Sequence, residues 1–184
     1  ERARTLLMDV NIEKVSTNTN RDYLHVHIVS THLLSKKLVI SLETAIKEQL
    51  FGLNPIQIKI VESYYLSSLY TPENLMKEYY DSILFELKKK SIVEYNMFLN
   101  AKYHFENENI LHLEFEDSIV AEQKATSIVA LISEIYEIRC HIPIRIEVEY
   151  RKAKKSKMQE HNALRLQQEI NAIVDGNVAK HKEI

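Results

Sequence analysis

The chain contains few of the residues that special backbone conformations and covalent cross-links require. Its 184 residues include one cysteine, two glycines, three prolines and no tryptophan. A single cysteine, Cys140, excludes an intrachain disulfide and any metal site built from several cysteines. Two glycines are too few for a glycine-rich phosphate-binding loop, and neither GxGxxG nor GxxxxGK[ST] is present. So little glycine and proline also argues against a collagenous, linker-like or wholly disordered chain.

A strong charge of one sign and long apolar runs are lacking as well. The formal net charge of −2 argues against a protein that binds nucleic acid with its whole surface, but it is compatible with a local basic patch. No apolar run approaches the roughly 18 residues of a membrane-spanning helix, and no signal peptide is evident. With 45% hydrophobic and 27% charged residues, the composition is that of a globular protein of one or two domains. The sequence begins at Glu1, which we interpret as a fragment of a longer protein.

Apolar periodicity between residues 10 and 60 predicts a β-β-α-β unit. A short apolar stretch is followed by turn-forming residues at 17–22, and then by strict alternation over 23–28, so a hairpin is expected. A helix is predicted over about 35–51, with Gly52 as a left-handed stop. Alternation over 56–60 predicts a third strand. The predicted apolar stripe of the helix consists of Leu38, Leu42, Ala45, Ile46 and Leu50.

The same order of elements recurs between residues 101 and 151. Two alternating stretches around 103–105 and 111–115 predict a second hairpin, Asp117 and Ser118 are typical of a helix start, and 144–148 alternates again. The recurrence fits an internal duplication, and it equally fits a common small arrangement that occurs twice. The predicted helical stripe consists of Ala121, Ala125, Ile128, Ile132 and Ile135.

A helical connector and a charged tail complete the predicted organisation. Thr71-Pro72 favours a helix start and 88–90 is a run of lysines suited to a helix end, with a shorter helix over 91–99. The sequence thus predicts an α+β protein: a first β-β-α-β domain at 1–69, a connector plus second β-β-α-β domain at 70–151, and a charged helical linker at 152–184. The connector stripe expected to be buried is Leu75, Tyr79, Ile83 and Leu87.

No constellation of reactive residues stands out in the sequence. GxSxG, HExxH and clustered cysteines are all absent. His25 and His27 share one side of a predicted strand, a spacing that can hold a metal and that is also typical of a solvated strand face. Cys140 follows Arg139, which could lower the pKa of its thiol, but no general base is evident, and a buried cysteine explains it as well. We therefore expect no catalytic residue, no metal and no cofactor.

Two stretches are candidates for binding rather than catalysis. Tyrosines gathered near residues 64–70 can anchor a protein partner, stack on bases, or simply pack between the two units. The basic run from residue 151 can contact phosphates or form a solvated helix start. The candidate partner-binding residues are Tyr64, Tyr65, Leu66, Leu69 and Tyr70. The candidate phosphate contacts are Arg151, Lys152, Lys154, Lys155 and Lys157.

Five stretches between residues 10 and 151 resemble the N-terminal region of PolC-type DNA polymerase III alpha chains of Gram-positive bacteria. They are IEKVSTNTNRDYLHVHIVSTHLLS, LVISLETAIKEQLFG, IQIKIVE, TPENLMKEYYDSILFELKKKS and KYHFENENILHLEFEDSIVAEQKA. The resemblance implies two small domains ahead of an OB-fold, a PHP domain, an exonuclease insertion and the polymerase core, with the tail after residue 151 as the linker to the OB-fold. It implies that the full-length protein is a DNA-directed DNA polymerase, a nucleotidyltransferase with 3'-5' exonuclease activity, whose catalytic residues lie outside this region.

The resemblance also implies a place and a partner. The place is the replication fork in the bacterial cytoplasm, and the partner is the tau subunit of the clamp loader, with no membrane and no small-molecule substrate. The second unit further resembles a K-homology (KH)-like fold, yet it lacks the GxxG loop that clamps nucleotide backbones. We therefore expect a docking module of a replicative polymerase. The alternatives are a KH-like module that binds single-stranded nucleic acid and a small enzyme with an unrecognised site.

Overall fold

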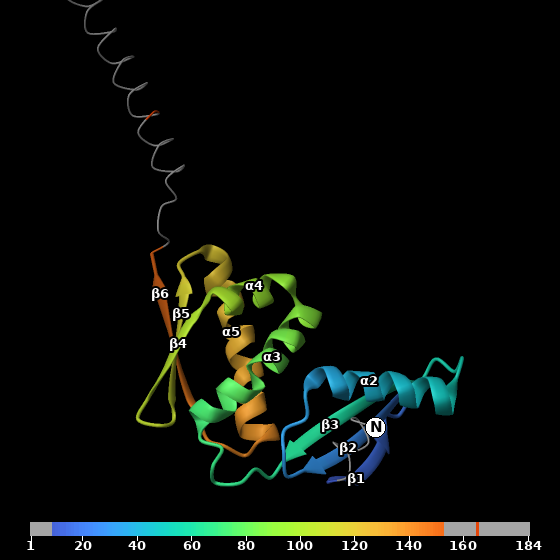
Figure 1. The fold of residues 1–184 in the computed structure, drawn as a ribbon. Helices are drawn as coiled ribbons and strands as arrows, with labels where there is room; N and C mark the ends of the chain where they lie inside the picture. The colour runs from blue at the N-terminus through green and yellow to red at the C-terminus, as the bar shows by residue number, and fades with distance from the viewer. Residues whose placement is uncertain (1–8, 153–164, 166–184) are drawn as a thin grey trace, which may run out of the picture. The chain divides into compact units, whose positions relative to one another are not determined.

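The computed structural model describes residues 9–152 and residue 165, and its six strands form two separate three-stranded sheets (Figure 1). In each sheet the middle strand pairs antiparallel with the strand before it and parallel with the strand after it. The predicted α+β class with two β-β-α-β units is therefore confirmed. The first sheet contains β1 (Val10–Thr17), β2 (Tyr23–Ser30) and β3 (Gln57–Tyr64), and the second contains β4 (Lys102–Glu106), β5 (Ile110–Glu116) and β6 (Arg145–Arg151).

Between residues 9 and 152, four α-helices cover the sheets. The helix α2 lies over the first sheet, whereas α3, α4 and α5 gather at the second (Figure 1). Two of the helices, α2 and α5, continue as π-helical segments that we label η1 and η2. The bounds are α2 (Lys36–Ile46), η1 (Lys47–Phe51), α3 (Pro72–Lys90), α4 (Ile92–Asn100), α5 (Ile119–Ser133) and η2 (Glu134–Arg139).

Each of these α-helices begins after a serine or threonine whose hydroxyl accepts a hydrogen bond from the backbone N–H three residues later. The cap residues are Ser35, Thr71, Ser91 and Ser118, with donor–acceptor distances of 3.3, 3.3, 3.4 and 3.0 Å. A cap of this kind satisfies one of the N–H groups that a helix start leaves unpaired. The predicted starts at 71 and 118 are therefore confirmed. Gly52 does end the first helix at positive φ, but its ψ of −118° lies outside the left-handed helical region.

The predicted core stripes of α3 and α5 are confirmed, because every residue in them is buried. The stripe predicted for the first helix is only partly correct: its first four members are half-buried, and Leu50 is exposed. Leu50 lies in η1, where wider π-helical turns rotate the apolar stripe away from the sheet. Val39 and Lys36 are buried instead.

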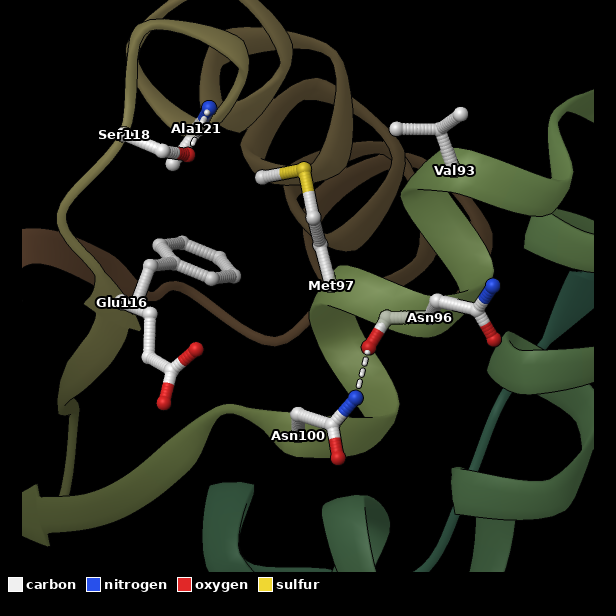
Figure 2. Close-up of a pocket in the computed structure, with 8 residues that line it drawn as sticks. Val93, Asn96, Met97, Asn100, Glu116, Ser118 and Ala121 are labelled. Carbon is white, nitrogen blue, oxygen red and sulfur yellow. Dashed lines mark hydrogen bonds between the residues drawn. The ribbon is translucent and has the colours of Figure 1, made fainter. Parts of the chain in front are cut away.

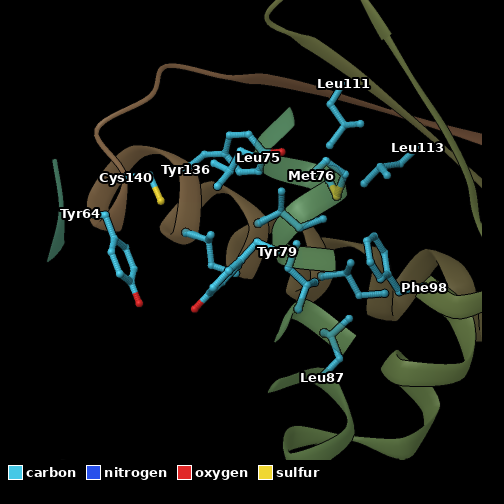
Figure 3. Close-up of a cluster of buried hydrophobic side chains, with 14 of the residues drawn as sticks. Tyr64, Leu75, Met76, Tyr79, Leu87, Phe98, Leu111, Leu113, Tyr136 and Cys140 are labelled. Atoms are coloured by element: carbon cyan, nitrogen blue, oxygen red, sulfur yellow. The ribbon is translucent and has the colours of Figure 1, made fainter. Parts of the chain in front are cut away.

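The two sheets share one hydrophobic core (Figure 3). Figure 3 shows side chains of α3 at its centre, with Tyr64 toward one end and Phe98 and Leu113 toward the other. One compact unit ends at Arg151. The division predicted at residues 69 and 70 stays a prediction, and the predicted linker lies almost entirely outside the described residues. None of the described helices is long and apolar enough to cross a membrane.

Candidate docking site

The tyrosine-rich segment predicted to bind a partner lies where the two units meet. It leads from β3 into α3 and lies against the loop between η2 and β6. Tyr65 stacks on His141 with ring centroids 5.1 Å apart, and the Ser63 hydroxyl lies 3.0 Å from Nε2 of His141. His141 has a φ of +55°, which is uncommon for a residue other than glycine. A cavity of about 280 Å³ opens between the segment and this loop.

The five candidate partner-binding residues divide into a buried and an accessible set. Tyr64 is fully buried, meets Tyr79 edge-on at 6.4 Å and points its hydroxyl to the carbonyl of Leu34 at 3.5 Å. The packing interpretation therefore applies to Tyr64. Tyr65 and Leu69 are 62% and 78% exposed. Two further candidates, Leu66 and Tyr70, are half-buried. The role of these four in binding stays a prediction.

Beneath the junction lie two buried ion pairs that local sequence patterns do not reveal. Nζ of Lys36 lies 2.6 and 2.8 Å from the two carboxylate oxygens of Glu62. The guanidinium of Arg139 donates to both carboxylate oxygens of Glu86, at 2.7 and 3.0 Å. The backbone N–H of Lys36 also donates to the Ser82 hydroxyl at 3.1 Å, which ties α2 to α3. Of these contacts, the one between Lys36 and Ser82 crosses from the first unit to the second. The pair of Lys36 and Glu62 joins α2 to β3 within the first unit, and the pair of Arg139 and Glu86 joins η2 to α3 within the second.

The surroundings of Tyr79 and Arg139 at this junction keep the tyrosine neutral and the arginine positively charged. Burial raises the pKa of the Tyr79 hydroxyl, and the negative charges of Glu62 and Glu86 raise it further. Burial lowers the pKa of Arg139, but the hydrogen bonds and charge of Glu86 outweigh that effect and raise it overall. Tyr79 thus stays neutral and Arg139 stays charged. A neutral phenol and a paired guanidinium hold the fold together and are poor nucleophiles or bases.

Cys140 is buried, and burial raises the pKa of its thiol to about 12. The neighbouring charge of Arg139 acts in the opposite direction but is the smaller effect. Because the thiolate is the nucleophilic form, a thiol that stays protonated at neutral pH is unreactive. The interpretation of Cys140 as a buried cysteine is confirmed.

The histidine pair on β2 and the first two residues of the basic run occupy exposed or half-buried positions. His25 and His27 are half-buried on the outer face of the first sheet, with ring centroids 6.5 Å apart. Among residues 9–152, no three His, Cys, Asp or Glu side chains are grouped closely enough to hold a metal ion. Arg151 pairs with Glu114 at 3.3 Å, and Lys152 is exposed. The other candidate phosphate contacts, Lys154, Lys155 and Lys157, lie outside the described residues.

A second candidate surface, which we call the α4–α5 groove, was not predicted from the sequence (Figure 2). It is a cavity of about 290 Å³ between α4, the end of β5 and the start of α5. Figure 2 shows Met97 reaching from α4 toward Ser118 and Ala121. The lining residues are Val93, Asn96, Met97, Asn100, Phe115, Glu116, Ser118 and Ala121.

Exposed aliphatic side chains border the α4–α5 groove. Ile119 is 75% exposed, and Ile92 and Val120 are also largely exposed. The sequence carried a signal for this surface. The nine residues of α4, IVEYNMFLN, place apolar side chains on more sides of the helix than a single core can bury. Phe98 alone among its apolar residues is fully buried, and two of the others, Val93 and Met97, line the groove.

Comparison with known proteins agrees with the sequence resemblance over the first unit. Residues 1–60 match the family model described as DNA polymerase III polC-type N-terminus I. This stretch contains β1, β2 and α2 and ends within β3. Neither the curated proteins nor the solved structures contain a match to the chain. Over its first 60 residues, the chain is thus similar to the N-terminal region of PolC-type DNA polymerase III.

Proposed function

We propose that this region is a non-catalytic docking module that holds a replisome protein, such as the tau subunit of the clamp loader, beside a PolC-type polymerase. The observation that best supports docking is the α4–α5 groove. Apolar side chains gathered on the surface around a cavity mark protein interaction sites more often than they mark chance exposure. The region would act in the bacterial cytoplasm, at the replication fork.

The shape of the α4–α5 groove suits a helix or a short apolar segment of the partner. Val93 and Met97 lie one helical turn apart on α4, and Ala121 faces them from α5. Grooves of this kind accept side chains at i, i+3 and i+4 of an amphipathic partner helix. Glu116 and the two asparagines at the edge supply polar contacts of the sort that border apolar interface centres.

The non-catalytic part of the proposal is supported by the state of the titratable groups. Among residues 9–152, the groups whose pKa clearly departs from its ordinary value are four tyrosines, Arg139 and Cys140, and in each the pKa is raised. Such groups keep their protons at neutral pH. A catalytic site more often combines a raised acid with a lowered base or nucleophile.

The exposed junction residues Tyr65 and Leu69 form the second candidate docking surface. Tyrosine is favoured at interface hot spots because it buries a large area at a small entropic cost. The Tyr65 ring is already held by stacking on His141, so a partner would find it in a fixed position. The two surfaces are distinguished by mutation.

The experiment is a pull-down of purified tau by the 184-residue chain in about 300 mM salt, where contacts that rest only on phosphate-like charge are weak. Retention of tau is expected, with no nucleotide incorporation and no exonuclease activity when magnesium is present. Val93→Asp with Ile119→Asp should abolish retention, because two charges would enter an apolar interface. Tyr65→Ala with Leu69→Ala tests the junction surface, and Leu53→Asp is the control for an exposed apolar residue elsewhere.

Two results would overturn the proposal. One is a failure to retain tau or any other replisome protein by the wild-type chain. The other is retention that both double variants leave unchanged. Incorporation or exonuclease activity that persists in the purified chain would contradict its non-catalytic character.

A further inference from the structure

The helix α2 covers one face of the first sheet (Figure 1). The opposite, outer face carries a row of rings and two lysines. Directly paired residues of neighbouring strands lie on the same face of a sheet. Tyr23, His25 and His27 alternate with the buried residues of β2 and therefore point outward. Lys14 of β1 pairs with His27, and Lys59 of β3 pairs with His25. We call these five residues the basic face.

The charge of the basic face is not neutralised within the described chain. None of the ion pairs formed among residues 9–152 includes Lys14 or Lys59. Two carboxylates lie nearby in the sequence. Glu13 is the residue inserted by a bulge in β1 and has no cross-strand partner, and Asp22 in the β1–β2 turn accepts a hydrogen bond from Asn18.

The rings of the basic face follow the middle strand at regular intervals. The ring centroids of Tyr23 and His25 are 6.2 Å apart, and those of His25 and His27 are 6.5 Å apart. The lysines flank this row from the two neighbouring strands. Sheet faces that bind single-stranded nucleic acid combine exposed aromatic rings, on which bases stack, with nearby cations that pair with phosphates.

The second sheet provides an internal contrast with the same topology. Its outer face also bears stacked rings, those of His104 and His112, with centroids 4.6 Å apart. Glutamates surround them, so this face repels phosphates rather than attracting them. The outward glutamates are Glu106, Glu114, Glu116, Glu147 and Glu149, against the cations Lys102, Arg145 and Arg151.

We propose that the basic face of the first sheet binds single-stranded DNA, with bases against Tyr23, His25 and His27 and phosphates on Lys14 and Lys59. This function is separate from partner docking and lies on the unit that has no resemblance to a KH fold. An acidic protein segment shares the charge of DNA, but it would also need apolar anchoring positions. The apolar side chains that point outward here are only Val29 and Val61, so the row of rings favours nucleic acid.

The test is the binding of a fluorescently labelled oligothymidine to the 184-residue chain, measured by anisotropy across a salt series. The binding constant should fall as the salt concentration rises. Lys14→Glu with Lys59→Glu should reduce the magnitude of the slope of log K against log salt concentration by about 1.4, because each phosphate contact on a single strand contributes about 0.7 to that slope. Tyr23→Ala with His25→Ala should weaken binding at every salt concentration, by roughly fivefold to a hundredfold for each base that loses its stacking partner.

Matched controls separate this face from the rest of the chain. Lys102→Glu, on the outer face of the second sheet, should leave binding unchanged, and Lys14→Arg with Lys59→Arg should preserve it. The proposal would be overturned if the chain did not bind the oligothymidine. It would also be overturned if Lys14→Glu with Lys59→Glu left binding unchanged, since the DNA would then be bound elsewhere, for example by the residues after 151. Equal binding of a polyglutamate peptide, insensitive to Tyr23→Ala, would assign the face to an acidic protein segment instead.

Discussion

The two β-β-α-β units have the same strand order and the same pairing, yet they bury their sheets to different extents. In the second sheet, Leu111, Leu113 and Phe115 of the middle strand are almost completely inaccessible, because α3, α4 and α5 gather against them. In the first sheet a single helix, α2, covers the inner face, and Ile12 of β1 stays 67% exposed. A shared topology therefore does not determine how much of a sheet is buried. That depends on the number of helices available to cover it.

Where α2 does not cover the first sheet, a cavity of about 220 Å³ lined by aliphatic side chains opens beside the helix. It begins at the edge strand β1 and ends against the second half of the helix. In the second unit, by contrast, three helices cover the sheet, and apolar residues of α4 and α5 remain at the surface in the groove proposed for docking. The residues around the cavity of the first unit are Val10, Ile12, Val26, Ile28, Leu42, Ile46 and Ile60.

The largest effect is expected at the largely buried ion pair that joins η2 to α3. Arg139→Ala leaves Glu86 without its cation in a largely buried site, which should lower the free energy of unfolding by about 3–5 kcal/mol. The matched control is Arg145→Ala, because Arg145 pairs with Glu147 at 2.8 Å on the exposed outer face of the second sheet. That change should cost no more than about 1 kcal/mol. Urea unfolding followed by circular dichroism measures both, and equal losses would show that burial does not distinguish the pairs.

A pair of isoleucines tests the difference in burial directly. Ile83→Ala, in the fully buried stripe of α3, should cost about 2–5 kcal/mol, since it removes buried methyl groups and leaves a cavity. Ile12→Ala, on the exposed edge strand, should change the free energy of unfolding by no more than about 0.5 kcal/mol. The same urea titrations give both values. A loss below about 0.5 kcal/mol for Ile83 would mean that the α3 stripe is not the core of the unit.

Much of this arrangement could be predicted because it is local. Caps such as Ser118 and the stripes of α3 and α5 follow from residues within a few turns of one another. The packing of Tyr64 was only one of the alternatives that the sequence left open, because the third strand was wrongly expected to end near Ile60. In fact β3 continues to Tyr64, and the inward position between them is occupied by Glu62, whose polar side chain interrupts the apolar alternation.

The ion pair of Glu62 explains why the sequence alone could not correct that error. Its partner, Lys36, lies 26 residues earlier, at the start of α2, where a lysine looks like an ordinary solvated residue. Long-range pairing of this kind leaves no periodic trace. The α4–α5 groove escaped prediction for a related reason, since its lining comes from three elements that only the fold brings together.

A smaller effect, linked to pH, is expected from the buried thiol at the junction. The pKa of Cys140 rises from 9.0 to about 12 in the fold, so above about pH 9 the unfolded chain loses this proton first. The free energy of unfolding should therefore fall by up to about 1.4 kcal/mol per pH unit as the pH rises toward 12. The buried tyrosines add a similar fall only above about pH 10, because their ordinary pKa is higher.

The variant Cys140→Ala isolates the contribution of the thiol. It should lack the fall between about pH 9 and pH 10 and keep the steeper fall above that range. Urea unfolding at a series of alkaline pH values provides the comparison with the wild-type chain. A fall of the same size in both proteins between pH 9 and 10 would show that the thiol is accessible to hydroxide in the fold.

The most direct measurement of the central claim is the dissociation constant of purified tau for the chain and for one variant of each proposed surface. We expect Val93→Asp with Ile119→Asp to weaken tau binding at least about tenfold, as when an interface anchor is lost, and Lys14→Glu with Lys59→Glu to leave it unchanged. The reverse pattern, or a constant that neither pair of substitutions moves, would contradict docking through the α4–α5 groove.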